Sequence, residues 1–125
     1  MISTKELIYS TLTASSALQA KLGAAGRIFN FYPEVTAVFP AVYFQDENQS
    51  DFEYADNRPH GSSVDVKIDI FTKTGSTLPT TWDIGEIVYE IMSGLDFNCG
   101  TNGEVPDPTD GVRHRVMRFS REFIS

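Results

Sequence analysis

Two histidines and one cysteine are the side chains in this sequence best suited to metal binding or nucleophilic catalysis. They are His60, His114 and Cys99, and they lie far apart in the chain. A structural zinc site needs four ligands, usually Cys and His at close spacing, so we predict no metal site. A lone cysteine is more often a small packed residue than a nucleophile. One cysteine also excludes an internal disulfide, which fits a reducing compartment.

An acidic stretch that begins at Asp46 has the alternating oxygen donors of a calcium loop. Asp46, Asn48 and Ser50 occupy alternate positions. The EF-hand pattern, however, requires glycine where this chain has Asp51, and a bidentate glutamate where it has Asn57. We therefore predict no calcium site.

Paired carboxylates, which can do acid–base chemistry, occur twice. Asp65 and Asp69 have the spacing of one strand face, and Glu86 and Glu90 have the spacing of one helix face. Both pairs are typical of solvated surfaces. The chain also has no G-x-S-x-G motif and no phosphate-binding glycine loop. The sequence therefore predicts no catalytic residue, no cofactor and no enzymatic activity.

The charged residues include one acidic and one basic cluster. Seventeen acids against ten bases give a net charge of −7, the opposite sign from that of a typical nucleic-acid-binding protein. We expect no tight DNA or RNA binding, although DNA could slide past an acidic wall. Two explanations of the clusters stay open: two solvated faces, or a head-to-tail contact between subunits. The candidate interface residues are Asp46, Glu47, Asp51, Glu53 and Asp56 in the acidic cluster, and Arg113, Arg115, Arg118 and Arg121 in the basic cluster.

Length and composition indicate a single domain over residues 1–125. A chain of 125 residues with 41% hydrophobic and 12% aromatic residues is typical of a globular protein. No apolar stretch approaches the roughly 20 residues of a membrane span. Polar residues interrupt the N-terminal segment, which does not resemble a signal peptide. We expect synthesis in the cytosol and no membrane association.

Two helices are predicted before the first strand. Ser3 and Glu6 have the spacing of a capping box at the start of the first helix. The second helix is short, begins at the Ser15-Ser16 pair, and carries Leu18 and Leu22 on one side.

Three strands are expected next. Arg27–Tyr32 and Phe39–Gln45 are rich in β-branched and aromatic residues, and Pro40 must lie at a strand start or on an edge. Ser63–Lys73 alternates apolar with polar residues, so one face is buried and the other is wet or covered by a polar partner. Asp46–Ser62 has no strong pattern. We predict a long loop there, part of which could extend the flanking strands as a projecting hairpin.

A longer helix is predicted over about Leu78–Ser93. Thr80 and Asp83 have cap-like spacing near its start, and Gly94 ends it. The apolar residues recur at helical spacing, so this helix should lie across the sheet. They are Trp82, Ile84, Ile87, Val88, Tyr89, Ile91 and Met92.

The rest of the chain comprises Leu95–Asn98, a loop over Gly100–Gly111 and a final strand over Val112–Ile124. Successive strands without helical crossovers favour an antiparallel sheet. The predicted fold class is therefore α+β, with a mainly antiparallel β-sheet, an N-terminal helix, and a second, longer helix packed on one face.

With these elements in place, the chain resembles the small tail-completion and tail-terminator (head–tail joining) proteins of long-tailed bacteriophages and prophages. The resemblance rests on five segments in order and covers nearly the whole chain. They are SALQAKLGAAGRIFNFYP, FPAVYFQD, SSVDVKIDIFTKTGS, WDIGEIVYEIMSGLDF and HRVMRFSREF.

The resemblance implies a structural virion protein that caps the head-proximal end of the tail tube and joins the tail to the head connector. Its partners would be the tail tube protein and the connector or neck proteins. Proteins of this kind often form six-membered rings around the DNA path, and they can stay monomeric until a template recruits them. The family has no catalytic residue to carry over, and the protein would be made in the bacterial host cytoplasm.

Two other functions stay open. One is another neck or minor tail protein, which would differ only in its docking partner. The other is a cytosolic, non-enzymatic ligand-binding α+β domain, which would need a concave apolar pocket with convergent polar groups.

Overall fold

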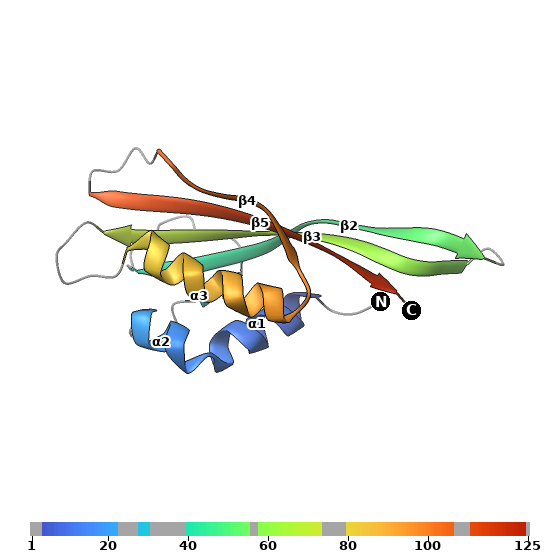
Figure 1. Cartoon of the computed structure of the whole chain (residues 1–125), viewed down its shortest axis with the longest axis horizontal. Coiled ribbons are helices and arrows are strands. Elements are labelled where there is room, and N and C mark those ends of the chain that lie inside the picture. The colour runs from blue at the N-terminus through green and yellow to red at the C-terminus, as the bar shows by residue number, and fades with distance from the viewer. Residues whose placement is uncertain are drawn as a thin grey trace.

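The computed structural model describes residues 4–22, 28–30, 40–55, 58–73, 80–106 and 111–124. Three helices lie on one face of a five-stranded sheet (Figure 1). The sheet order is β1-β2-β3-β5-β4, with β1 parallel to β2 and every other pair antiparallel. The elements are α1 (Thr4–Ala14), α2 (Ser16–Leu22), β1 (Ile28–Asn30), β2 (Ala41–Ala55), β3 (Arg58–Lys73), α3 (Thr81–Gly94), β4 (Asn98–Val105) and β5 (Val112–Ile124).

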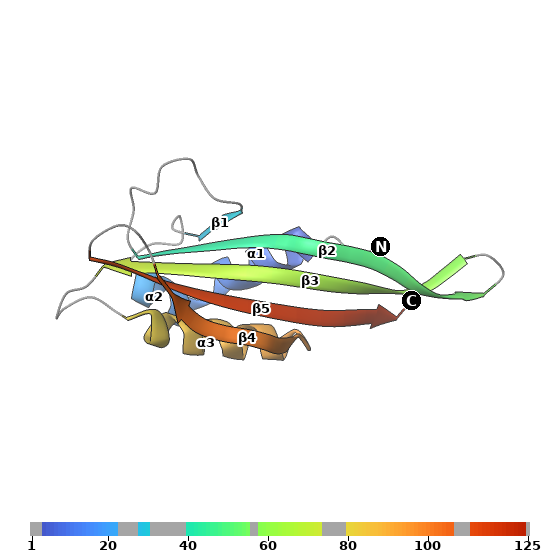
Figure 2. The ribbon, with the colours of Figure 1, turned by 90° about the horizontal axis from the view of Figure 1, so that it is seen from above.

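This arrangement confirms the predicted α+β fold class. We call the face of the sheet that the helices cover the helix face, and the other the reverse face (Figure 2). Pro40 directly precedes β2, at the strand start where a residue without an N–H is tolerated. Among the described residues, no helix is long and apolar enough to cross a membrane.

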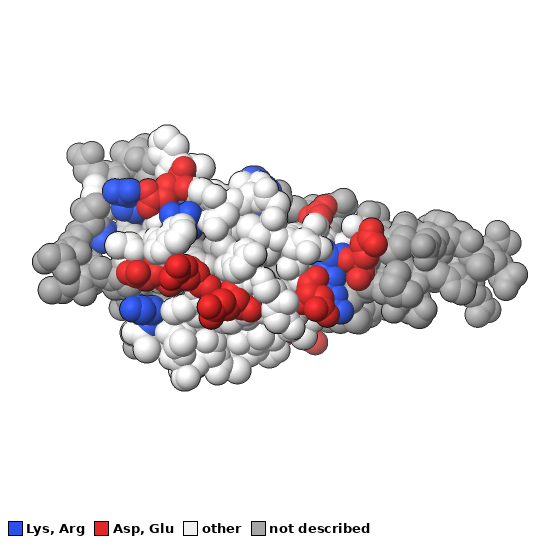
Figure 3. Space-filling model, viewed as in Figure 1, with Lys and Arg blue, Asp and Glu red and all other residues white. Residues whose placement is uncertain are grey.

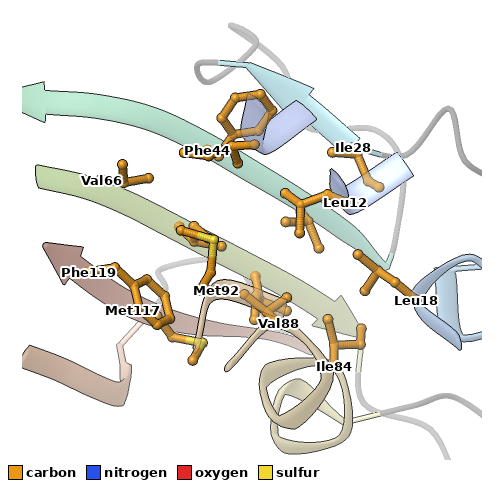
Figure 4. Close-up of a cluster of buried hydrophobic side chains, with 14 of the residues drawn as sticks. Leu12, Leu18, Ile28, Phe44, Val66, Ile84, Val88, Met92, Met117 and Phe119 are labelled. Atoms are coloured by element: carbon orange, nitrogen blue, oxygen red, sulfur yellow. The ribbon is translucent and has the colours of Figure 1, made fainter. Parts of the chain in front are cut away.

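The main core lies between the helices and the helix face. The alternation in β3 places Val64, Val66, Ile68 and Ile70 there, all fully buried. On the opposite side of this core, α1 and α2 contribute leucines (Figure 4). α3 contributes Ile84, Val88 and Met92. The other buried members are Ile8, Leu12, Leu18, Leu22, Ile28, Val42, Phe44, Phe97, Met117 and Phe119.

The reverse face is less exposed to solvent than the alternation of apolar and polar residues in β3 predicts. Ala41, Tyr43, Phe71 and Val112 form a second buried cluster there. Asp69 shares this face and is only 1% exposed. Its neighbours across the sheet are Tyr43 of β2 and Val116 of β5, so apolar side chains flank the carboxylate on both sides.

The two shorter helices follow the sequence pattern. α2 begins after Ser15, whose Oγ accepts a hydrogen bond of 3.2 Å from the backbone N–H of Leu18. This is the N-cap interaction that a serine at this position predicts. Leu18 and Leu22 are both buried. The capping box expected at Ser3 lies outside the described residues.

α3 begins three residues before the first core isoleucine, at a capping box. Thr80 Oγ1 accepts a 3.2 Å hydrogen bond from the Asp83 backbone N–H, and Asp83 Oδ2 accepts a 3.0 Å bond from the Thr80 backbone N–H. The helix includes Gly94 as its last residue, and the left-handed residue beyond it is Asp96, with φ 65°. The expected start at Leu78 falls outside the described residues.

Two predicted core residues of α3 lie at the surface instead. Trp82 is 55% exposed and Tyr89 is 46% exposed, whereas Met92 is fully buried. Residues 82 and 89 are seven apart, so they share one flank of the helix, beside the stripe that packs on the sheet. The prediction that they widen the core face is wrong.

The described part of Asp46–Ser62 consists of paired strands, as in the projecting hairpin that the sequence left open, and not of a long loop. β2 and β3 stay paired as far as Ala55 and Arg58, and β5 pairs with β3 as far as Gly61. The hairpin extends beyond the helices (Figure 1). Backbone pairing with a long, strongly alternating neighbour therefore decides the conformation of a segment with weak intrinsic preference.

The predicted loop over Gly100–Gly111 is also partly wrong. Residues 98–105 form β4, which pairs with β5 with one irregularity between Cys99 and Thr101. β4 is an edge strand, where glycines such as Gly100 and Gly103 are tolerated because one side of the strand needs no packing.

Candidate functional site

The four arginines of the basic cluster lie on two different faces of β5. Strand residues alternate between faces. Arg113, Arg115 and Arg121 contact groups on the helix face. Arg118 has the opposite parity, is exposed, and lies across from Lys67 on the reverse face. The basic cluster is therefore not one continuous patch.

Arg113 and Arg115 belong to a polar network at the junction of α3, β4 and β5. Arg113 forms an ion pair with Glu104. Arg115 Nη1 donates to Asn102 Oδ1 at 2.9 Å, and its Nε donates to Thr81 Oγ1 at 3.3 Å. Thr81 in turn donates to Glu104 at 2.5 Å. The hydrogen bonds from Arg113 and Thr81 hold the pKa of Glu104 below its usual range.

Arg121 has a structural contact of its own. Its Nη1 donates to the backbone carbonyl of Leu95 at 2.5 Å. Leu95 is the C-cap of α3, where unpaired carbonyls favour a cation. Arg121 therefore ties the end of α3 to β5.

The acidic cluster lies on the projecting hairpin. The backbones of Asp46, Glu47, Asp51 and Glu53 belong to β2, and Asp56 lies outside the described residues. β3 separates β2 from β5 in the sheet order. Within one chain the acidic strand is therefore not adjacent to the basic strand, and contact between the two as strands would require a second subunit.

A groove that the sequence pattern does not predict lies between α3 and the β4–β5 edge of the sheet. It has a volume of about 410 Å³. Its helix wall carries two exposed aromatic rings and two exposed acids, and acidic side chains follow one another over α3 (Figure 3). The lining residues are Trp82, Gly85, Glu86, Tyr89, Glu90, Asn102 and Arg115. The i, i+7 spacing of the two aromatic residues was the signal for this surface, because both fall beside the isoleucine stripe and not within it.

Arg115 lines this groove and lies close to Trp82. Its Cζ lies 5.4 Å from the centroid of the Trp82 ring, within cation–π range. A Cβ at Gly85 would come within 3.1 Å of Arg115 Cδ. Glycine at this position therefore lets the arginine pass close to the helix backbone.

The other candidates from the sequence do not converge on a catalytic site. Cys99 packs against the main core on the helix face, whereas His114 stacks on Phe71 on the reverse face. The sheet separates the two side chains, and burial raises the pKa of the Cys99 thiol. In the part of the chain that the structure describes, no three His, Cys, Asp or Glu side chains come together as metal ligands.

The sequence of this chain matches one known protein family over most of its length. The family described as "Tail completion protein gp17" matches residues 6–121, a range that contains all of the sheet except the last residues of β5.

The chain belongs to this tail completion family.

Tail completion proteins are structural proteins of the phage particle, so this chain is a structural tail protein. The family confirms the resemblance that the five sequence segments indicated.

A solved structure shares the fold. It is a chain from a structure titled "Virion of native gene transfer agent (GTA) particle", with 16% sequence identity and a TM-score of 0.68. The similarity covers 94% of this chain and 92% of the other. A comparison with curated proteins finds none that matches.

Proposed function

We propose that this tail completion protein caps the head-proximal end of the tail tube and joins the tail to the head connector. The observation that carries the proposal is the family match over residues 6–121. The fold that the chain shares with a component of a gene transfer agent virion supports a place in a particle of this kind. The protein acts there through its surfaces, without catalysis and without a cofactor.

Its partners in this proposal are the tail tube protein on one side and the connector or neck proteins on the other. Copies of the chain form a ring around the DNA path, and the free protein is a monomer until the tube recruits it. A net charge of −7 suits a lumen through which DNA slides, because an acidic wall repels phosphates. The protein is made in the host cytoplasm and ends in the virion.

Contacts between neighbouring subunits in the ring join the acidic hairpin to the basic strand. Long β2 and β3 extend beyond the helices (Figure 1), and the backbones of Asp51 and Glu53 belong to the outer part of this hairpin, which can reach the next subunit. Of the four arginines, Arg118 is exposed on the reverse face, and the Arg113 side chain is 55% exposed. Because these two arginines lie on opposite faces of the sheet, they are two alternative contacts for the hairpin of a neighbour in this arrangement.

Electron microscopy of a lysate that lacks only this gene tests the proposal. We expect filled heads that lie apart from unjoined tails. Overlong tails would identify the protein as the terminator of tube growth, and tails of normal length would identify it as the joining protein. Intact, infectious virions would contradict the proposal.

A further inference from the structure

The groove beside α3 has the composition of a protein-docking site. Large aromatic residues are enriched at the energetic centres of interfaces. Trp82 and Tyr89 are about half exposed on the same helix flank. A partner that covers these two rings gains the free energy of burying their apolar surface.

The groove is also preorganised before any partner binds. Arg115 is held by Asn102 and Thr81, and its guanidinium lies within cation–π range of the Trp82 ring. Fewer side chains must then be ordered on binding, which lowers the entropic cost of the complex.

The charge of the groove selects the partner. Glu86 and Glu90 are exposed on its outer rim, and among the described residues neither carboxylate has a hydrogen-bond or ion-pair partner. The positive charge of Arg115 is offset by Glu104, which interacts with it electrostatically. A Lys or Arg between the two aromatic rings would gain cation–π contacts and the attraction of both carboxylates.

The shape of the groove favours an extended segment. One wall belongs to β4, the last strand in the sheet order. Among the described residues, no strand pairs with its outer edge. A segment that runs beside β4 can hydrogen-bond to this edge and direct alternate side chains into the groove, as in β-strand addition.

We propose that this groove docks an extended, lysine- or arginine-bearing segment of another virion protein. The proposal rests on the proposed function, which places the protein between other structural components. A second copy of the chain is the less favoured occupant, because each copy carries a net charge of −7 and would bring a further excess of acid to an acidic rim. The ring contacts proposed above use other residues.

A photo-cross-linking amino acid in the assembled particle tests the occupant. Benzoylphenylalanine replaces Tyr89 in one variant and Tyr9 in the control, because both tyrosines are 46% exposed and Tyr9 lies on α1. We expect the variant at position 89 to cross-link to a different virion protein, at a peptide with Lys or Arg within about two residues of the attachment point. We expect no such product from position 9.

Three outcomes of that experiment would overturn the proposal. They are a product between two copies of this chain, attachment to a peptide without a basic residue, and no product that is specific to position 89.

Charge reversal provides the second test. The variant E86K/E90K should reduce the yield of joined particles at least about tenfold. The control E6K/E122K makes the same change in net charge at two other exposed acids and should leave the yield unchanged. Emission from Trp82, the one tryptophan of the chain, and circular dichroism show whether each variant is folded.

Normal joining by folded E86K/E90K would contradict the groove proposal, as would an equal loss in the control. If the gene deletion still separates heads from tails, the proposed function survives either result.

Discussion

The carboxylate of Asp69 lies 2.7 Å from Nε2 of His114, on the reverse face of the sheet. Asp69 is almost fully buried, and the imidazole also stacks on Phe71 with a ring-centroid distance of 4.2 Å. A buried carboxylate costs free energy unless hydrogen bonds replace its water. His114, together with Lys67 at 3.9 Å, therefore provides polar partners for a side chain that the alternation of β3 would have placed in solvent.

Replacing His114 by alanine should lower the free energy of unfolding by about 1–3 kcal/mol, because Asp69 loses a hydrogen bond in a buried site. The measurement is urea unfolding followed by circular dichroism. S120A is the matched control, since Ser120 is exposed on the same strand and face, and it should cost less than about 0.5 kcal/mol. Equal losses in the two variants would show that the contact does not stabilise the fold.

The network around Glu104 predicts a dependence of stability on pH. The hydrogen bond from Arg113 lowers the pKa of Glu104 from its ordinary value of 4.5. Because the folded pKa lies below the unfolded one, the stabilisation is complete above about pH 5 and is lost as the pH falls through the folded pKa. The difference in Tm between the wild type and E104Q should therefore be constant near neutral pH and shrink below about pH 4.5. A difference that stays constant down to pH 3 would contradict this account.

Gly85 and Gly94 form a matched pair of glycines in α3. A Cβ at Gly85 would come within 3.1 Å of Arg115 Cδ, whereas a Cβ at Gly94 would meet nothing within 4 Å. Alanine in place of glycine favours a helix by up to about 1 kcal/mol, but in G85A the Arg115 side chain, which lies over the Trp82 ring, must also shift by a few tenths of an ångström. We expect G85A to unfold at a lower temperature than G94A, and only G85A to change the tryptophan emission. Identical emission from both variants would argue against the stacking.

Reversal of two arginines tests the proposed contact between subunits. R113E/R118E should prevent assembly on the tail while the isolated protein stays folded by circular dichroism. The control K21E/K73E makes the same charge change at two other exposed positions and should assemble normally. Unchanged assembly of R113E/R118E would exclude the hairpin-to-strand contact.

The sequence predicts those elements in which local pattern and long-range packing agree. The alternation of Val64 to Ile70 follows the pleat of a strand that buries one face, and the structure confirms it. Thr80 and Asp83 cap α3 as their spacing predicts, because a capping box is a local interaction.

The errors occur where a distant partner decides the outcome. β4 contains two glycines and two asparagines, and it forms a strand because β5 supplies a partner backbone. Asp69 is buried because residues on two other strands flank it. Neither effect can be read from a single segment.

The features of the candidate site that local sequence determines were predictable, and those that depend on packing between distant segments were not. The exposure of Trp82 and Tyr89 depends on how α3 is rotated about its axis against the sheet, and helical spacing fixes only which residues share a flank. The sequence grouped four arginines that the sheet distributes over two faces. The contact between the acidic and basic clusters stays a prediction, because it concerns a second subunit.

Complementation in vitro tests the central claim most directly. Purified protein is added to a lysate of phage that lack this gene, and the infectious titre is measured before and after the addition. The account predicts that separated heads and tails join and that the titre rises by orders of magnitude. A lysate that is already infectious without the protein, or one that stays non-infectious after its addition, would contradict a role in completing the tail.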